Sequence, residues 1–439
     1  MFTGEIMRYF YLPLICLLLL PDLALAADLA SLQASMDTVW LMTAGALVFF
    51  MQAGFALVEG GMVRAKNSVN VIMKNYVDAC FGAIAFWMVG YGLMFGDNFS
   101  GWFGESHFLL GNAAHLDYSL LFFQTMFAAT AATIASGSLA ERIEYKAYLV
   151  GSVLVTAIIY PVFGSWAWGS LYQGTGWLKE MGFIDFAGST VVHSIGGWVA
   201  LAGIIVLGPR LGKFGSDGEI RSIRGHNLPM VALGGFILWL GWFGFNGGST
   251  AAANVSIGLI NLNTHLSGAA GAIGAMVGMM LMRQRILLTN TVNGSIAGLV
   301  AITAGCATME PMYAIATGAF AGVLMIWGSM LLERLRLDDV VGAVSVHAIG
   351  GAWGTLAAGL FYAGDMFNAD KVLVQLLGIG AAFLWAVPVS LLMYFLIDRV
   401  MGLRASTVHE QRGLDFTEHD EIGYPEFQQD IVHQSQGGH

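Results

Sequence analysis

Charged residues are scarce in this 439-residue chain, where Asp, Glu, Lys and Arg together make up 11%. A soluble domain carries about 25%, so the deficit excludes a soluble protein built around an ordinary core. Apolar residues make up 56% and the mean hydropathy is +0.69, which indicates lipid as the main solvent. The 58 glycines are spread through the apolar runs, where small residues let transmembrane helices approach closely.

Cysteine is also rare. Of the three cysteines, Cys16 falls in a predicted signal peptide, and Cys80 and Cys306 lie in separate apolar segments. Their positions form neither a disulfide framework nor a metal-ligand spacing. The sequence has no C-x-x-C-H motif for covalent haem attachment.

Residues 1–27 are predicted to be a signal peptide. Arg8 is a short basic region, residues 9–20 are apolar, and Ala24 to Ala26 form an A-x-A-like cleavage site. This apolar run is too short to span a membrane. The prediction places the mature N-terminus outside the cytoplasm.

The remaining chain contains eleven apolar segments of the length that crosses a bilayer, about 20 residues each. These predicted spans are residues 36–60, 69–95, 117–138, 145–168, 189–208, 227–247, 254–282, 287–306, 310–332, 343–362 and 373–400. Sixteen Lys and Arg residues lie at the C-terminal end or in alternate loops and their edges, against two, Lys179 and Lys371, in the intervening loops. The positive-inside rule therefore predicts N-out, C-in. The predicted fold class is an all-α integral membrane protein.

A thirteen-residue motif occurs twice. Residues Asp185–Gly197 match Asp339–Gly351 at seven positions, and an Asp precedes a His by eight residues in both. In the predicted topology the two copies enter from opposite faces, as in an inverted repeat. We expect a membrane domain at 28–402, with repeats at about 36–208 and 227–362, an extra helix at 373–400 and a cytoplasmic tail at 403–439.

Each motif histidine is expected near the bilayer midplane. Eight residues at a rise of 1.5 Å put His193 and His347 roughly 12 Å into a hydrocarbon layer of about 30 Å. A buried histidine can simply join two helices by a hydrogen bond, which is the preferred interpretation for the lone His265. Two matched histidines favour a functional site. The alternatives are a bis-histidine haem, a metal site, for which neither copy supplies carboxylate or thiolate ligands at that depth, and a neutral hydrogen-bonded imidazole pair that lines a pore.

A second group of residues lies at the predicted outer ends of other spans. Phe123 and Phe127 share one helix face, and Phe245 and Ser249 share another, because both pairs are spaced i, i+4. Trp168 ends the fourth span. Each aromatic alone is typical of a membrane-interface belt, but together they can attract a cation through their ring faces.

The chain resembles the Amt/Rh ammonium transporters over nearly its whole mature length. The matching stretches are Gly54–Asn67, Leu139–Ile143, Asp185–His193, Gly241–Asn246 and Asp338–His347. The resemblance implies that Phe123, Trp168 and Ser249 form an outer recruitment site and that Phe127 and Phe245 form a stacked gate. It also implies that His193 and His347 are the pore histidine pair and that Asp185 is a structural acid near the vestibule. It also implies a homotrimer, and residues 411–420 resemble the family's regulatory tail, which can contact a PII-type signalling protein.

The expected function is transport without enzymatic activity, cofactor or metal. NH₄⁺ is expected to bind outside, lose its proton near the gate and pass the histidines as NH₃, while the proton follows separately. We expect a multi-pass protein of a bacterial inner membrane, with no nucleic acid as partner. The main alternative is an ammonium sensor that does not conduct and signals to a cytosolic partner. A channel for neutral gases is a further alternative.

Overall fold

The computed structural model describes the backbone of residues 4–110 and 118–425, and side chains from residue 28 onward. Within these ranges the chain is helical, without strands and with three isolated β-bridges. The principal helices are α1 (Gly4–Met62), α2 (Ser68–Val77), α3 (Ala83–Ala85), α4 (Tyr91–Phe95), α5 (Tyr118–Ser138), α6 (Tyr145–Leu154), α7 (Tyr160–Ala167), α8 (Trp177–Glu180), α9 (Ile195–Leu207), α10 (Leu228–Gly248), α11 (Ser256–Leu281), α12 (Leu288–Ile302), α13 (Pro311–Arg334), α14 (Gly350–Leu360), α15 (Ala369–Met401), α16 (Thr407–Arg412) and α17 (Leu414–His419).

Nine helical stretches in the described part of the chain are long and apolar enough to cross a membrane. They coincide with nine of the eleven predicted spans. The other two predicted spans contain shorter apolar helices, Leu288–Ile302 and Val344–Leu360. Fifteen residues in α12 extend about 22 Å, which is less than a hydrocarbon layer of about 30 Å. Nine spans are therefore confirmed by length and composition, and the count of eleven stays a prediction.

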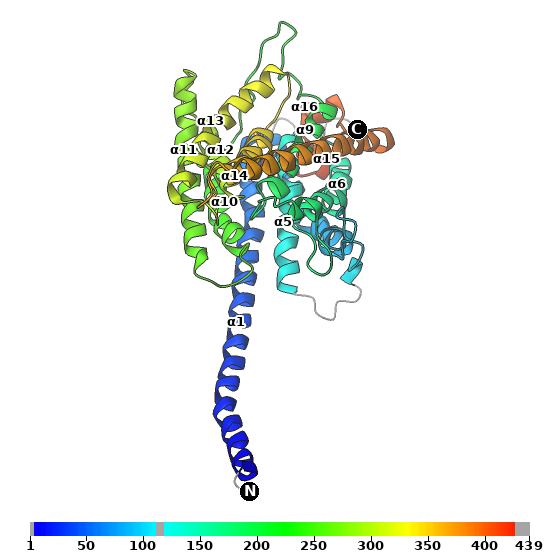
Figure 1. Cartoon of the computed structure of the whole chain (residues 1–439). Coiled ribbons are helices and arrows are strands. Elements are labelled where there is room, and N and C mark those ends of the chain that lie inside the picture. Colours follow the sequence, from blue (N-terminus) through cyan, green and yellow to red (C-terminus); the bar gives the residue numbers. More distant parts are fainter. Residues whose placement is uncertain (1–3, 111–117, 426–439) are drawn as a thin grey trace.

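The predicted signal peptide lies largely outside what the structure describes. Residues 1–3 and the side chains of residues 4–27 are not described, and the backbone from Gly4 onward belongs to the single long helix α1 (Figure 1). Residue 117, at the edge of a predicted span, and the end of the tail beyond 425 are likewise outside the described residues.

Several spans contain a wider, π-helical turn. These turns are η2 (Asp78–Gly82), η3 (Phe86–Gly90), η5 (Val155–Ile159), η6 (Ser189–Ser194) and η7 (Val344–Ile349). Such turns are rare and often occur at functional sites. Both copies of the repeated motif adopt one, η6 leading into α9 and η7 into α14, so similar sequence forms the same unusual backbone twice.

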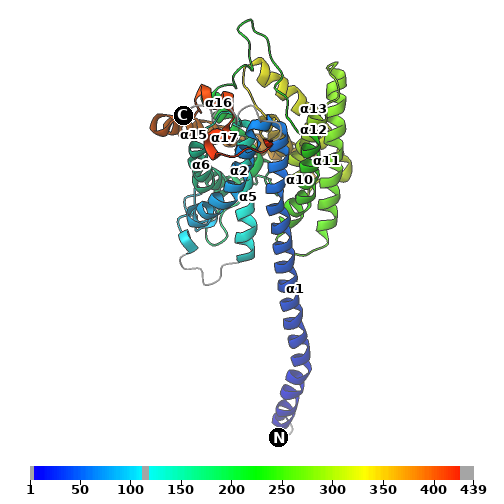
Figure 2. The same ribbon diagram turned by 180° about the vertical axis from the view of Figure 1, so that it is seen from behind.

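The centre of the molecule is formed where α1 packs along α10 and where η6 and α9 meet η7 and α14. Glycines allow the first contact. A Cβ at Gly54 would lie 2.8 Å from Leu238, and one at Gly241 would lie 2.2 Å from Met51. Figures 1 and 2 show α10 to α13 on one side of α1, and α2, α5 and α6 on the other.

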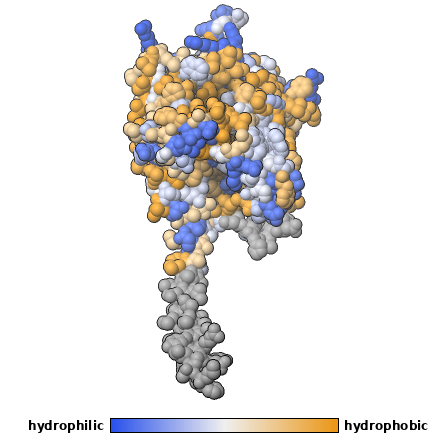
Figure 3. Space-filling model, in the orientation of Figure 1, coloured by the Kyte–Doolittle hydropathy of each residue, from blue (hydrophilic) through white to orange (hydrophobic). Residues whose placement is uncertain are grey.

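The outer surface of the bundle is rich in apolar side chains. Large hydrophobic residues are exposed on many helices, for example Phe236 on α10 and Leu384 on α15. Figure 3 shows apolar side chains over much of the visible face, with strongly hydrophilic groups at the upper end and in patches lower on the same face. A surface of this kind suits a lipid environment rather than water.

The tail helices α16 and α17 lie at one end of the bundle, with α17 against α2 (Figure 2). Lys66 Nζ donates to the carbonyl oxygens of Glu410 and Gln411, and the backbone N–H of Asn70 donates to Asp415. Arg210 forms a buried ion pair with Asp338 at the same end, with N–O distances of 2.8 and 2.9 Å. The tail and the basic loops therefore share one face.

Candidate functional site

The two motif histidines meet at the centre of the bundle. His193 in η6 and His347 in η7 are 0% and 4% exposed, and their Nδ1 atoms lie 3.3 Å apart. The rings are nearly parallel, with centroids 5.3 Å apart and planes inclined by 27°. At this distance one nitrogen donates its proton to the other, so the pair is suited to holding a shared hydrogen bond.

Each histidine-bearing turn is held by the acid that precedes it. The Asp185 carboxylate accepts four hydrogen bonds, from the backbone N–H groups of residues 188, 189, 190 and 191. The Asp339 carboxylate accepts from those of residues 342, 343 and 344, and from the Ser138 hydroxyl. These bonds satisfy the N–H groups that a helix start leaves unpaired. Asp185 is 5% exposed, as a structural acid would be.

Glycines bring the two turns into contact. A Cβ at Gly197 would lie 2.4 Å from the backbone nitrogen of Ala348, and one at Gly351 would lie 2.2 Å from the carbonyl oxygen of Ser189. No side chain fits at either position without moving the backbone. The two glycines are equivalent in the repeated motif, and together they set the distance between the histidines.

A column of aromatic rings continues outward from the pair. Phe245 stacks on His193 at 5.3 Å and on Phe127 at 3.9 Å, with planes inclined by 27° and 19°. Phe127 also contacts Phe123, at 4.6 Å, and the edge of Trp168, at 6.3 Å. Phe127 and Phe245 are fully buried, and rings 3.9 Å apart leave no space between them for water.

The outer end of the column carries the three residues predicted to form a recruitment site. Trp168 and Ser249 are partly exposed, and Phe123 is 1% exposed. The Trp168 indole N–H donates to the carbonyl oxygen of Asp185 at 2.7 Å, which fixes the ring. The Ser249 hydroxyl donates to the carbonyl oxygen of Phe245 at 2.8 Å, so its own lone pairs remain free to accept a hydrogen bond.

Gly248, the residue before Ser249, packs against the Phe123 ring of the column. A Cβ at Gly248 would lie 2.7 Å from the Phe123 ring, so this glycine provides the space in which that ring rests. The structure therefore brings all seven predicted pore and recruitment residues into one continuous arrangement, with Asp185 beside it.

Three further residues belong to this arrangement and were not predicted. Trp242 stacks on His193 at 4.9 Å and donates to Thr303, Phe55 contacts His347 at 6.1 Å, and Glu59 lines a cavity beside His347. Trp242 lies three residues before Phe245 on the same helix, a spacing that places both on one face and was available in the sequence. By contrast, His265 lies on the exposed face of α11, against Trp239 and Phe243.

The geometry of the histidine pair favours one of the three interpretations left open by the sequence. Two axial haem ligands lie on opposite sides of the iron, so nitrogens bonded at about 2.0 Å are held roughly 4 Å apart. The observed Nδ1–Nδ1 distance is 3.3 Å, with the rings almost stacked. That distance is within reach of a hydrogen bond and too short for two ligands on opposite sides of a haem iron. A tetrahedral ion would hold two nitrogens about 3.3 Å apart, but the described residues contain no group of three or more metal-ligating side chains that could complete such a site.

Comparison with known proteins agrees with this arrangement. The sequence model of the Ammonium Transporter Family matches residues 39–424. The chain is 44% identical to the ammonium transporter Amt2 of Archaeoglobus fulgidus, covering 89% of this chain and 88% of that protein. It is 42% identical to a putative ammonium transporter of Synechocystis, covering 88% and 73%.

Solved structures show the same fold. A protein described as "Sensor Amt Protein" superimposes with a TM-score of 0.86 at 41% identity, covering 89% of this chain and all of that one. Mep2 of Candida albicans superimposes with a TM-score of 0.78 at 27% identity, covering 85% and 87%. With a family match over nearly the whole chain, relatives above 40% identity and the same helical architecture, this multi-pass membrane protein belongs to the ammonium transporter family.

Proposed function

We propose that this chain conducts ammonium nitrogen as NH₃ through the pore of each subunit. The observation that carries the proposal is the unbroken column that runs from Trp168 through Phe127 and Phe245 to the hydrogen-bonded pair of His193 and His347. It offers cation-binding rings at its outer end and a polar pair in its buried centre.

NH₄⁺ is recruited at the outer end. The faces of Trp168 and Phe123 each attract a desolvating cation by about 0.5–2 kcal/mol. The Ser249 hydroxyl accepts a hydrogen bond from the ammonium N–H, which K⁺ cannot donate. This site therefore selects by hydrogen bonding as well as by charge.

The stacked gate requires deprotonation. Taking an unpaired cation into a dry apolar constriction costs on the order of tens of kcal/mol in the Born limit, against roughly 2–7 kcal/mol for a neutral polar group. Two or three cation–π contacts do not close this gap. NH₄⁺ loses its proton at the gate and NH₃ passes when the Phe127 and Phe245 rings separate, whereas K⁺ has no proton to lose and is rejected.

The histidine pair carries the proton separately, which makes transport electrogenic. The test is current from purified protein on a solid-supported membrane after ammonium and K⁺ pulses. Wild type is expected to respond to ammonium and not to K⁺, and His193→Ala and His347→Ala are expected to lose the ammonium current. His265→Ala is the matched control, because this histidine lies outside the column. Wild-type current from either pore variant would refute the relay.

A second candidate function is ammonium sensing without conduction. It is favoured by the similarity to the protein described as "Sensor Amt Protein". The same assay separates the two functions, since a sensor binds ammonium and gives only a small binding current whose decay rate is independent of the protein-to-lipid ratio. A sustained current whose decay rate changes with that ratio identifies a transporter.

The finer organisation is also proposed. We infer an inverted repeat with the N-terminus outside and the tail inside, in a bacterial inner membrane, and a homotrimer with one pore per subunit. The gathering of the tail with Lys66 and Arg210 at one end supports a common cytoplasmic face, where a PII-type protein would bind. Native mass spectrometry tests the trimer, and protease accessibility in sealed vesicles tests the orientation of the tail.

A further inference from the structure

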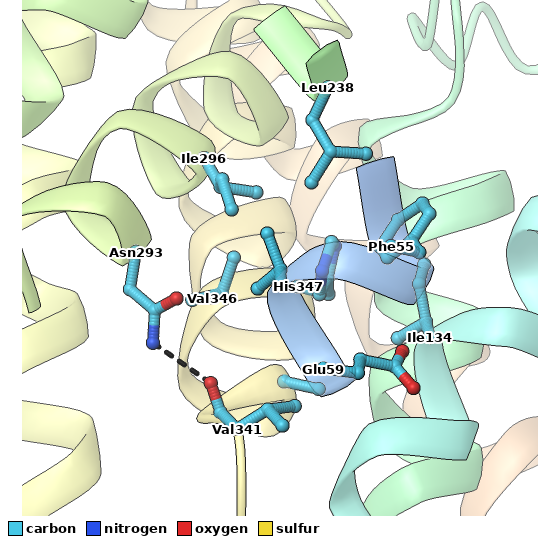
Figure 4. A pocket seen from close by; sticks show the side chains of 11 residues that line it. Phe55, Glu59, Ile134, Leu238, Asn293, Ile296, Val341, Val346 and His347 are labelled. Carbon is cyan, nitrogen blue, oxygen red and sulfur yellow. Dashed lines mark hydrogen bonds between the residues drawn. The ribbon is translucent and has the colours of Figure 1, made fainter. Parts of the chain in front are cut away.

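A buried carboxyl group lies on the side of the histidine pair opposite the aromatic gate. Glu59, on α1, is 2% exposed. It lines a cavity whose other walls include His347, Phe55, Ile134 and Asn293. The water-accessible volume of this cavity is about 20 Å³, which is enough for one water molecule. Figure 4 shows Glu59 and His347 on neighbouring walls, with the carboxylate turned toward Ile134.

The surroundings of this carboxyl group are shaped to hold it. The Asn75 side-chain amide donates to Glu59 Oε2 at 2.9 Å. On the facing helix, a Cβ at Gly137 would lie 2.9 Å from the Glu59 carboxyl carbon and 2.5 Å from Val341. An alanine at 137 would therefore displace the carboxylate. The Asn75 amide therefore binds the Glu59 carboxylate, and the absence of a side chain at Gly137 leaves the space that the carboxylate occupies.

Behind Glu59 lies a group of buried polar side chains that the gate and the histidines do not use. Lys74 Nζ, fully buried, donates to the carbonyl oxygen of Ser136 at 2.9 Å. Asp78, also fully buried, accepts from the hydroxyls of Tyr148, Ser152 and Thr133. The titratable groups that face Glu59 from the packed elements are Lys74, Asp78 and His347. Buried ionisable groups in a membrane protein commonly belong to proton or ion pathways.

The contacts between α1 and α10 relate Glu59 to the outer site. Residues Gly54–Gly61 can be laid over Gly241–Gly248, which pairs Glu59 with Asn246 and ends both segments in Gly-Gly. The contacts between the helices follow the same pairing. Gly54 contacts Leu238, and the paired residues Gly241 and Met51 are also in contact. Gly61 contacts Val231, and the paired residues Gly248 and Ala44 are likewise in contact. Asn246 precedes Ser249 by three residues at the outer end, so Glu59 occupies the corresponding place at the inner end.

We propose that Glu59 is the proton-relay residue on the inner side of the histidine pair, receiving the proton that His347 releases and passing it toward the cytoplasm. The inference rests on the proposed function. In the step, an N–H bond of the His347 imidazolium breaks and a water in the cavity carries the proton over. An O–H bond then forms on Glu59, and its later ionisation returns the carboxylate and delivers the proton to the inner solution. No electron changes hands.

The test compares charge with nitrogen in the same proteoliposomes. Solid-supported-membrane current measures the charge moved, and uptake of ¹⁵N-labelled ammonium measures the nitrogen. Glu59→Gln keeps the shape and replaces the titratable carboxyl group with an amide, so the charge moved per nitrogen is expected to fall at least tenfold. Glu59→Asp retains a carboxyl group and is expected to keep more than half of the wild-type ratio. Ile296→Val, on the wall of the same cavity, is the matched control and is expected to leave the ratio unchanged.

The outcomes separate the relay from a structural role and from the proposed function. Loss of current and uptake together, at an unchanged ratio, would show a structural role and overturn the relay. Absence of sustained ammonium current from wild type would overturn conduction itself. If Glu59→Gln does not purify as a folded protein, infrared difference spectra of wild type and Glu59→Asp decide. Ammonium must produce a protonated-carboxyl band that shifts in frequency between the two, and a missing or unshifted band refutes the proposal.

Discussion

Gly351→Ala tests whether the close approach of the two π-helical turns holds the histidine pair together. A Cβ at this position would lie 2.2 Å from the carbonyl oxygen of Ser189. A carbon and a carbonyl oxygen approach to about 3.3 Å, so the turns must separate by about 1 Å. The histidine nitrogens are 3.3 Å apart, and about 1 Å more breaks their hydrogen bond.

The variant should fold but lose stability and current. Overpacking of this kind typically costs about 1–3 kcal/mol, which thermal unfolding of the detergent-solubilised protein will detect. We expect the ammonium current to fall to the level of His347→Ala, because the same hydrogen bond is lost.

The neighbouring glycine provides the control. A Cβ at Gly350 would lie no closer than 3.7 Å to any atom, with the carbonyl oxygen of Ala297 as its nearest neighbour. Gly350→Ala is therefore expected to retain wild-type current and stability. Equal behaviour of the two variants, whether both active or both inactive, would refute the argument that contact between the turns sets the geometry of the pair.

Two further predictions concern the end of the bundle where the tail packs. Asp338→Asn removes the closer of the two carboxylates that pair with the buried Arg210 guanidinium and leaves only Glu141, at 3.4 Å. Removing one partner of a buried pair costs about 3–5 kcal/mol when the other charge is left alone, so a drop in thermal stability of up to that size is expected. Glu219→Gln, on an exposed pair, should change little. Because Arg210 holds the pKa of Asp338 well below its usual range, this contribution is lost only in strong acid. Burial, and then the neighbouring Glu144, raise the pKa of Glu418 from 4.5 to about 8 when the tail is docked. The docked tail thus binds a proton that a free tail releases, so docking weakens as the pH rises from about 4.5 to 8. Limited proteolysis should cut the tail faster at pH 8.5 than at pH 6, and Glu418→Gln should abolish the difference.

The apolar runs predicted most of the fold because hydropathy reports directly on what must face lipid. Nine of the predicted spans are confirmed, within four residues at each end except at the start of the first, which is at Asp28 rather than residue 36. The remaining two are shorter than predicted because α12 ends in turns after Ile302, four residues before the predicted end, and the other helix ends at Leu360, before a turn at Phe361. Run length in a sequence includes such turns, so it overestimates the helix.

The sequence predicted those site residues whose location depends only on their position along a helix or in the repeated motif. His193 and His347 follow from the repeat, and the facing of Phe123 and Phe127 follows from i, i+4 spacing. The π-helical turns do not follow, because nothing in Ser189–Ser194 marks an extra residue per turn. The roles of Phe55 and Glu59 depend on which face of α1 packs toward η7, and a helix that is apolar on all sides carries no such signal.

The two copies of the repeated motif adopt the same backbone, yet their histidines are not equivalent. His193 is enclosed by the rings of Trp242 and Phe245, and its Nε2 has no hydrogen-bond partner among the described residues. His347 borders a cavity that also contains a carboxyl group. The difference comes from the helices that cross them, because α10 presents Asn246 where α1 presents Glu59. Under the proposed function, a symmetric imidazole pair has no preferred direction for a proton. The difference between Glu59 and Asn246 supplies that direction by placing a carboxyl group in the cavity beside His347.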